Sequence, residues 1–230
     1  MPRPRREAQR QATADEIKTI ARTQMREKGT VGLSLRAIAR EMGVTAPAIY
    51  NYFPSLDDLI TALIVDAFKA HADAIEGAAQ IEGSIRERFG AALHAYRDWA
   101  TANAADFQLI YGNPIPGYEA PADVTIPLAA RPLAFMTRML YEASESDGVS
   151  ISMSYTTLPE TNLHHLKRII AQFTEITVPP ELLYMVMVAV TRIQGIVMLE
   201  IFEHLGPTVG SVDDFFAHEV AVILDMLGLI

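Results

Sequence analysis

The chain of 230 residues is half apolar, carries a net charge of −9 and contains no cysteine. A chain of this length and apolar content can bury a substantial core, so disorder is not the default expectation. The lack of cysteine excludes disulfides, thiolate metal sites and a cysteine nucleophile, and it suits a reducing cytosol.

Charge is distributed unevenly along the sequence. Residues 1–50 carry 10 Lys and Arg against 5 Asp and Glu, whereas residues 51–230 carry 9 against 23. A polyanion would be attracted to the first segment and repelled by the second. A solvated charged terminus without a partner explains the same balance, so charge alone does not decide between the two interpretations.

No part of the sequence indicates a membrane partner or a signal peptide. The basic N-terminus is followed by the charged stretch Asp15–Lys18 instead of an apolar segment. The longest apolar run, 182–201, is interrupted by Arg192, Gln194 and Glu200, as expected for a buried helix of a soluble protein. We therefore expect a cytoplasmic protein.

Helical periodicity accounts for the elements of this chain, and no alternating run is long enough to build a sheet. The predicted fold class is all-α. A first helix is expected over 13–28, with Thr13 as N-cap, Glu16 completing a capping box and Gly29 following its C-terminus.

Two short helices separated by a tight turn come next. The first is expected to begin after Ser34 as N-cap and to end at Gly43. The second is expected to begin after Thr45 as N-cap, to tolerate Pro47 in its first turn and to end at Pro54. This spacing is typical of a DNA-recognising helix-turn-helix.

A long helix from Ser55 to about Ala79 connects this motif to the acidic remainder of the chain. Further helices are expected over 82–102, 106–111, 125–147, 162–174, 180–204 and 212–228. Two breaks separate some of them, Asn113–Asp123 and Gly148–Pro159, and the second is expected to be mobile.

The second short helix begins with small side chains, which a helix needs in order to approach the major groove closely. Ser34 and nearby backbone N–H groups can hold a phosphate, and Arg36 suits a bidentate contact to guanine. The residues predicted to contact DNA are Ser34, Arg36, Thr45, Ala46, Pro47, Ala48, Tyr50, Asn51 and Tyr52.

These residues resemble the tetracycline-repressor (TetR) family of bacterial transcriptional regulators. The resemblance is carried by Ser34–Ala39, Gly43–Thr45, Ala48–Ser55 and Leu59, and it covers roughly the first 60 residues. It implies a ligand-responsive regulator, more often a repressor, that binds a palindromic double-stranded DNA operator as a homodimer. The alternative from another class is a helical-bundle enzyme or small-molecule carrier with an incidental helix-turn-helix.

One position departs from the family pattern. After Ser55 the family usually has a lysine that resembles a phosphate anchor, whereas this chain has Leu56. The grip on phosphate is then expected to depend more on Ser34, Tyr50, Tyr52 and a basic N-terminal arm. This arm either enters the minor groove or is disordered and only solubilising. Its arginines are Arg3, Arg5, Arg6 and Arg10.

A second stretch resembles the TetR-like C-terminal domains named for a Trp-His-Gly signature. The matching residues are Trp99–Ala100, Phe107–Pro114, Pro116–Pro121 and Gly195–Glu200, with Gln194 where a histidine is expected. In the family, this domain binds a small molecule inside a helical bundle.

The resemblance implies two domains. Residues 1–54 would form the basic arm and the three-helix DNA-binding domain, and residues 55–230 the helical ligand-binding and dimerisation domain. Dimerisation would use 180–204 and 212–228, which are more apolar than a one-sided surface helix needs. The alternative is that these two helices are central core. A largely apolar effector is expected to contact Tyr96, Trp99, Phe107, Tyr111, Met136, Met139 and Gln194.

Catalytic and metal sites are not expected. The acidic and histidine residues near the C-terminus lack the Glu-x-x-His pairs of di-iron bundles. No Gly-rich phosphate loop or nucleophile elbow occurs. The predicted protein is therefore not an enzyme and uses no cofactor and no metal. The residues considered for a metal and set aside are Glu200, Glu203, His204, Asp214 and His218.

Overall fold

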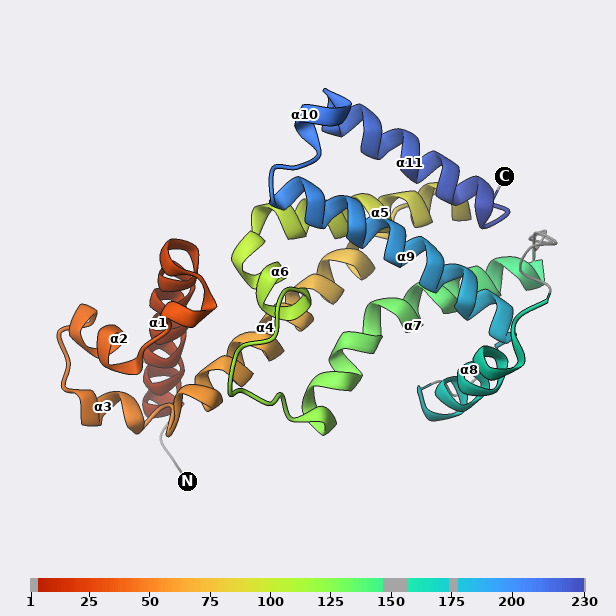
Figure 1. Cartoon of the computed structure of the whole chain (residues 1–230). Helices are drawn as coiled ribbons and strands as arrows, with labels where there is room; N and C mark the ends of the chain where they lie inside the picture. Colours follow the sequence, from red (N-terminus) through yellow and green to blue (C-terminus); the bar gives the residue numbers. More distant parts are fainter. Residues whose placement is uncertain (1–3, 147–156, 174–177, 230) are drawn as a thin grey trace. The chain divides into compact units, whose positions relative to one another are not determined.

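The computed structural model describes residues 4–146, 157–173 and 178–229, and every regular element in these ranges is helical (Figure 1). The predicted all-α fold is confirmed. Residues 148–156 of the break predicted to be mobile, 148–159, lie outside the described residues.

The helices follow the predicted order, with two short additions, η1 and α10. They are α1 (Pro4–Lys28), the 3-10 turn η1 (Thr30–Gly32), α2 (Leu35–Glu41), α3 (Ala46–Tyr50), α4 (Leu56–Ala78), α5 (Ile85–Ala102), α6 (Ala104–Tyr111), α7 (Ala122–Ser146), α8 (Glu160–Phe173), α9 (Pro180–Ile201), α10 (Gly206–Val209) and α11 (Val212–Met226).

The chain divides into two compact units, and α4 and α7 each continue from one unit into the other. The first unit comprises Met1–Phe68 and Asn103–Thr125, and the second comprises Lys69–Ala102 and Ile126–Ile230. The functional division into residues 1–54 and 55–230 stays a prediction.

Helix α1 begins at Pro4, well before the predicted start at Thr13. Thr13 is therefore not an N-cap, and the capping box with Glu16 was wrong. The Thr13 hydroxyl instead donates to the Gln9 carbonyl oxygen over 3.1 Å, inside the helix. Proline suits the first position of a helix, and the Glu, Ala, Gln and Arg residues that follow favour helix strongly enough to outweigh the internal cap signal.

The turn between α2 and α3 forms where the sequence predicts it. The Ser34 hydroxyl oxygen accepts a hydrogen bond from the Ala37 N–H over 3.3 Å, which confirms the predicted N-cap of α2. Gly43 follows with φ of 67°, a left-handed conformation that favours glycine. Thr45 occupies the N-cap position of α3, although in the described structure its side chain makes no capping hydrogen bond. Helix α3 ends at Tyr50, before Pro54.

The first unit has a core built by α1, α2, α3 and the first half of α4, and α6 packs on α1. One apolar face of α1 is buried, and α3 contributes a single fully buried anchor, Ile49. Since α3 is otherwise exposed or half-buried, its position depends on this anchor and on its neighbours. The core side chains of this unit include Ile17, Ala21, Met25, Leu35, Ile38, Ile49, Leu59 and Leu63.

The second unit is organised around α9, which contacts α5, α8 and α11. Among the described residues, α9 is the one helix long and apolar enough to cross a membrane. One face of it is buried in this unit, as in the core helix of a globular bundle. The buried side chains of α9 are Leu182, Leu183, Met185, Val186, Ala189, Ile193, Ile196 and Val197.

Candidate nucleic-acid interface

The tip of α3 is a small, exposed surface. Thr45 and Pro47 are exposed, and Ala46 and Ala48 are half-buried. These four side chains are short, so the helix can approach another surface closely. The buried side chain of Ile49, 1% exposed, holds the helix against the core while its opposite side stays open.

A cavity of about 440 Å³ lies on one side of α3 and joins three of the predicted DNA-contacting residues, Ser34, Arg36 and Tyr50. A guanidinium and two hydroxyl groups are suitable donors for a phosphate oxygen. Leu56 also lines this cavity, at the position where the family usually has a lysine. The complete lining is Leu33, Ser34, Leu35, Arg36, Tyr50, Pro54, Ser55 and Leu56.

Ser55 was missed as a lining residue because the sequence assigns it only to capping. Its hydroxyl does cap α4: the oxygen accepts from the Asp58 N–H over 3.1 Å, and the hydroxyl donates to Asp58 Oδ2 over 2.6 Å. With its proton committed to this carboxylate, Ser55 shapes the cavity without offering a donor to a ligand.

A second cavity of about 440 Å³ lies between α1 and α3 and is lined by Asn51 and Tyr52. Tyr50 and Tyr52 therefore face different cavities, since Tyr50 is the last residue of α3 and Tyr52 lies in the turn that follows it. The α1 side of this cavity was missed, since residues before Thr13 were expected to form an arm. The complete lining is Arg6, Gln9, Arg10, Thr13, Ala48, Asn51 and Tyr52.

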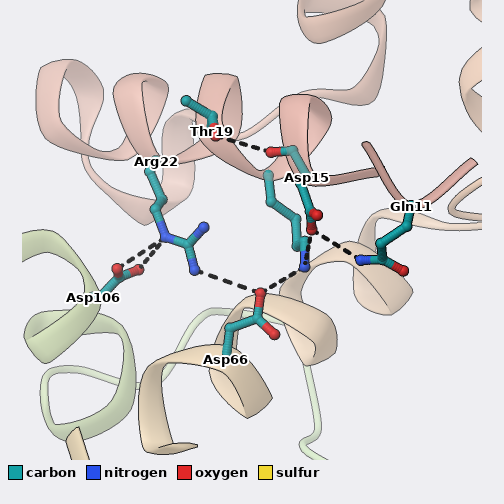
Figure 2. A network of polar contacts seen from close by, with 7 residues as sticks. Gln11, Asp15, Thr19, Arg22, Asp66 and Asp106 are labelled. Carbon is teal, nitrogen blue, oxygen red and sulfur yellow. Dashed lines mark hydrogen bonds and ion pairs between the residues drawn. The ribbon is translucent and has the colours of Figure 1, made fainter. Parts of the chain in front are cut away.

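Two of the basic residues of α1 form ion pairs with carboxylates of the first unit (Figure 2). Lys18 Nζ lies 2.7 Å from an Asp66 carboxylate oxygen and 2.9 Å from one of Asp15. Arg22 Nε lies 2.9 Å from Asp106 Oδ2, and its Nη2 lies 3.7 Å from Asp66. These pairs join α1 to α4 and α6, so Lys18 and Arg22 contribute little field to a DNA surface.

Burial and pairing act against each other in this network. Burial lowers the pKa of Lys18, but hydrogen bonds to Asp66 and Asp15 outweigh it and hold the pKa above its usual value. For Asp106, burial raises the pKa despite the opposing charge and hydrogen bond of Arg22. The Asp106 carboxylate thus depends on Arg22 to stay charged in a partly desolvated place.

Comparison with known proteins gives two family matches. Residues 19–63 match the family described as bacterial regulatory proteins, tetR family, and residues 89–223 match the tetracyclin repressor-like C-terminal domain. The second match alone covers more than half of the chain. The protein belongs to the TetR family.

Individual relatives agree with this assignment. HTH-type transcriptional regulator Rv1816 of Mycobacterium tuberculosis is 42% identical over 129 residues, a stretch that spans 55% of this chain and 55% of the relative. SCO4313, described as a regulatory protein, has a crystal structure with a TM-score of 0.79 and 30% identity, covering 98% of this chain and 100% of that one. The TetR family transcriptional regulator PfmR from Thermus thermophilus shares the fold, with a TM-score of 0.62 at 17% identity over 91% of this chain and 97% of its own.

The residues predicted from the sequence to contact an effector fall in both units. Tyr96, Met136 and Met139 are buried in the second unit, where Trp99 and Gln194 are half-buried. The remaining two residues belong to α6 in the first unit, Phe107 buried and Tyr111 half-buried, with ring centroids 5.0 Å apart. Five of the seven predicted effector residues therefore lie in the second unit.

His71, which was not predicted from the sequence, lies beside the predicted aromatic residues. Its ring centroid is 4.4 Å from that of Tyr96 and 4.8 Å from that of Trp99. Burial lowers the pKa of His71 to about 4, so the imidazole is neutral at neutral pH. A polar residue on the apolar face of the α4 sequence, between Ala67 and Ile75, was the signal that could have revealed it.

A cavity of about 440 Å³ in the second unit is lined by α7 and by Glu76 of α4. None of the predicted effector residues lines it. Its Arg131 is held by two carboxylates, with Nη2 at 2.8 Å from Asp73 and 2.7 Å from Glu76. The lining residues are Glu76, Pro127, Ala130, Arg131, Ala134, Phe135 and Arg138.

Proposed function

We propose that this TetR-family protein is a cytoplasmic homodimeric repressor that binds a palindromic operator and is released by a small, largely apolar effector. The observation that carries the proposal is the exposed tip of α3 with an arginine-lined cavity on each side. Small side chains permit entry into the major groove, and the flanking donors suit the phosphates along its edges.

Contacts to bases would come from α3 and from Arg36 at the start of α2. Thr45, Ala46, Pro47 and Ala48 form the tip, and Ala or Pro there can pack on a thymine methyl group. Arg36 is exposed and can form a bidentate contact to guanine. Ser34, Tyr50 and Tyr52 would hold phosphates, with Asn51 contacting a base or a phosphate.

Dimerisation is proposed through α9 and α11. Along one side of α9, Met187 and Leu199 have exposed fractions of 41% and 46%, and the C-cap residue Phe202 has an exposed fraction of 45%. Gly195 lies on the same side, where a methyl group added to its Cα would meet no atom within 4 Å. An apolar side with a glycine at its middle allows a helix from a second subunit to approach closely.

The effector is proposed to enter the second unit near Tyr96, Trp99, Met136, Met139 and Gln194. Aromatic and methionine side chains accommodate irregular apolar ligands, and the single amide would orient the ligand. The neutral His71 beside them adds no charge to this environment. Phe107 and Tyr111 of α6 stay proposed effector contacts, and the relation of the second unit to the Trp-His-Gly subgroup stays a prediction.

Release would follow from a shift of population. In a dimer, the two α3 helices must enter major grooves one helical turn apart, about 34 Å. An effector that binds better to dimers with another spacing lowers the population competent for DNA. Helix α4 is continuous from the helix-turn-helix into the second unit, so it is the element proposed to carry the change.

Selection of bound duplexes from random DNA tests the proposal directly. The expected result is an enriched palindrome whose half-sites are centred about one helical turn apart. Size-exclusion chromatography with light scattering then measures the stoichiometry on that duplex. Failure to enrich any sequence, together with retention of apolar small molecules, would favour the carrier alternative.

A further inference from the structure

The cavity between α1 and α3 is built from a regular helix and not from a disordered arm. Arg6 and Arg10 are one turn apart in α1, and Thr13 follows on the same side. All three line the cavity. The expected arm is thus helical from Pro4 onward, with Arg3 outside the described residues.

Arg10 is hydrogen-bonded to the C-terminal end of α3. Its Nη2 donates a hydrogen bond to the backbone carbonyl oxygen of Asn51 over 3.2 Å. Asn51 is the C-cap of α3, where carbonyl groups lack partners within the helix and favour a cation. The remaining N–H groups of the Arg10 guanidinium stay available at the cavity.

The cavity has the chemistry of an anion site. Among the described residues that line it, two are cations and none is a carboxylate. The Gln9 amide and the Tyr52 hydroxyl can donate as well, which suits an oxyanion with several acceptor oxygens. Its volume of about 440 Å³ leaves room for a phosphate with its flanking sugars.

We propose that this cavity binds one backbone phosphate of the operator in each half-site, through Arg6, Arg10 and Tyr52. This inference rests on the proposed function and adds to it: Arg6 and Arg10 grip the backbone beside the major groove, and they neither enter the minor groove nor form a disordered arm. Because Arg10 is bonded to the end of α3, the same phosphate contact fixes how α3 is oriented toward the bases.

The first experiment measures operator affinity against salt for the full-length dimer. Replacing Arg6 and Arg10 together by Gln removes one neutralised phosphate per subunit. The slope of log affinity against log salt is expected to become shallower by about 2 for the dimer, at roughly 0.9 for each phosphate. The matched control is Arg26→Gln, an exposed position of α1 whose Nη2 hydrogen bonds Thr23 outside the cavity, and its slope should equal wild type.

The second experiment locates the phosphate. Single phosphates of the selected operator are replaced by neutral methylphosphonates, and wild type should lose roughly tenfold in affinity at each contacted phosphate, one of which in each half-site is the phosphate held by this cavity. The Arg6→Gln, Arg10→Gln double variant should lose nothing more at that position, because the contact is already gone. A full additional loss at every sensitive position overturns the proposal.

Other outcomes also overturn it. A changed preference for A·T over G·C pairs in the double variant would place these arginines in the minor groove. Chemical shifts of the Arg6 and Arg10 guanidinium groups that respond to inorganic phosphate but not to duplex would mark a site for free anions. Wild type that shows no salt-dependent binding to any duplex would remove the proposed function itself, whereas wild-type binding with an unchanged double variant removes only the phosphate site.

Discussion

The arginines beside α3 in the first unit differ from four arginines of the second unit in whether they pair with carboxylates. In the first unit, Arg6, Arg10 and Arg36 line cavities beside α3, and none of them is within ion-pair distance of a carboxylate in the described structure. Four arginines of the second unit instead form ion pairs with carboxylates. These are Arg86, Arg97, Arg131 and Arg192.

The difference shows that charge in a sequence and charge available to a partner are distinct quantities. A guanidinium paired with a carboxylate of the protein has its field largely cancelled nearby, and its removal leaves that carboxylate without a partner. An unpaired guanidinium keeps its field for a polyanion. Even within the basic first 50 residues, Lys18 and Arg22 are of the paired kind, so the surface around α3 depends on fewer cations than composition suggests.

The largest expected effect is that of salt on operator binding. A dimer that neutralises about 6 to 10 phosphates should lose roughly 10³ to 10⁵ in affinity between 50 and 200 mM salt. Fluorescence anisotropy with a labelled operator measures this loss. The free energy of unfolding, measured in urea over the same salt range, should change far less because partly buried pairs are weakly screened. An affinity that does not depend on salt would contradict this comparison, because it would show that Arg6, Arg10 and Arg36 do not contact DNA phosphates.

The next largest effect is expected for Arg97→Ala. Arg97 binds Glu200 through Nε at 2.7 Å and Nη2 at 2.6 Å, binds Asp213 at 2.6 Å, and lies 5.0 Å from the Phe216 ring centroid. Removing it leaves the half-buried Glu200 without its cation and should lower the free energy of unfolding by about 3 kcal/mol. Urea denaturation measures the change.

The control for this prediction is Arg97→Lys, which keeps the charge but loses the bidentate geometry, so it should recover only part of the stability. Operator affinity of the folded Arg97→Ala dimer should stay near wild type. A large loss of affinity with little loss of stability would contradict the assignment of Arg97 to the fold.

A smaller effect is expected for Arg36→Ala, and it should fall on operator binding instead of on stability. The variant should lose about 1 to 3 kcal/mol of operator binding and relax base preference at one position per half-site, if Arg36 is bidentate to guanine. Its free energy of unfolding should change by less than about 0.5 kcal/mol, because the side chain is exposed. Competition between operators that differ at single base pairs provides the measurement. Equal weakening on all sequences would instead assign Arg36 to a phosphate in the cavity that it lines.

The smallest effect is expected from Leu56→Lys, which restores the residue that the family usually carries. The new ammonium group would lie at the cavity shared with Arg36 and Tyr50, and it should steepen the salt dependence by about 1 per subunit. Affinity at low salt should rise modestly. The control is Lys at Ile81, an exposed position of the second unit, and it should leave the slope unchanged. An unchanged slope in Leu56→Lys as well would show that the operator backbone does not reach this cavity.

The helix-turn-helix was predictable because its signals are local. Ser34 caps α2 through a hydrogen bond from Ala37, and Gly43 takes a left-handed conformation directly after the same helix, so short-range sequence determines both. The start of α1 was not predictable from a cap signal, because Thr13 offers one that the continuous helix from Pro4 overrides. The cavity between α1 and α3 was missed for the same reason. The residues before Thr13 were expected to form an arm, and an arm has no fixed position against α3.

The sequence by itself determined the all-α fold, the helix-turn-helix and the basic-to-acidic change along the chain, because these depend on composition, periodicity and local caps. Only the tertiary structure decided which cations are paired. Lys18 meets Asp66 and Arg22 meets Asp106 across 48 and 84 positions of sequence, and Arg10 reaches Asn51 across 41. Ion pairing depends on distances of a few ångströms between segments far apart in the chain, and packing of the helices sets those distances.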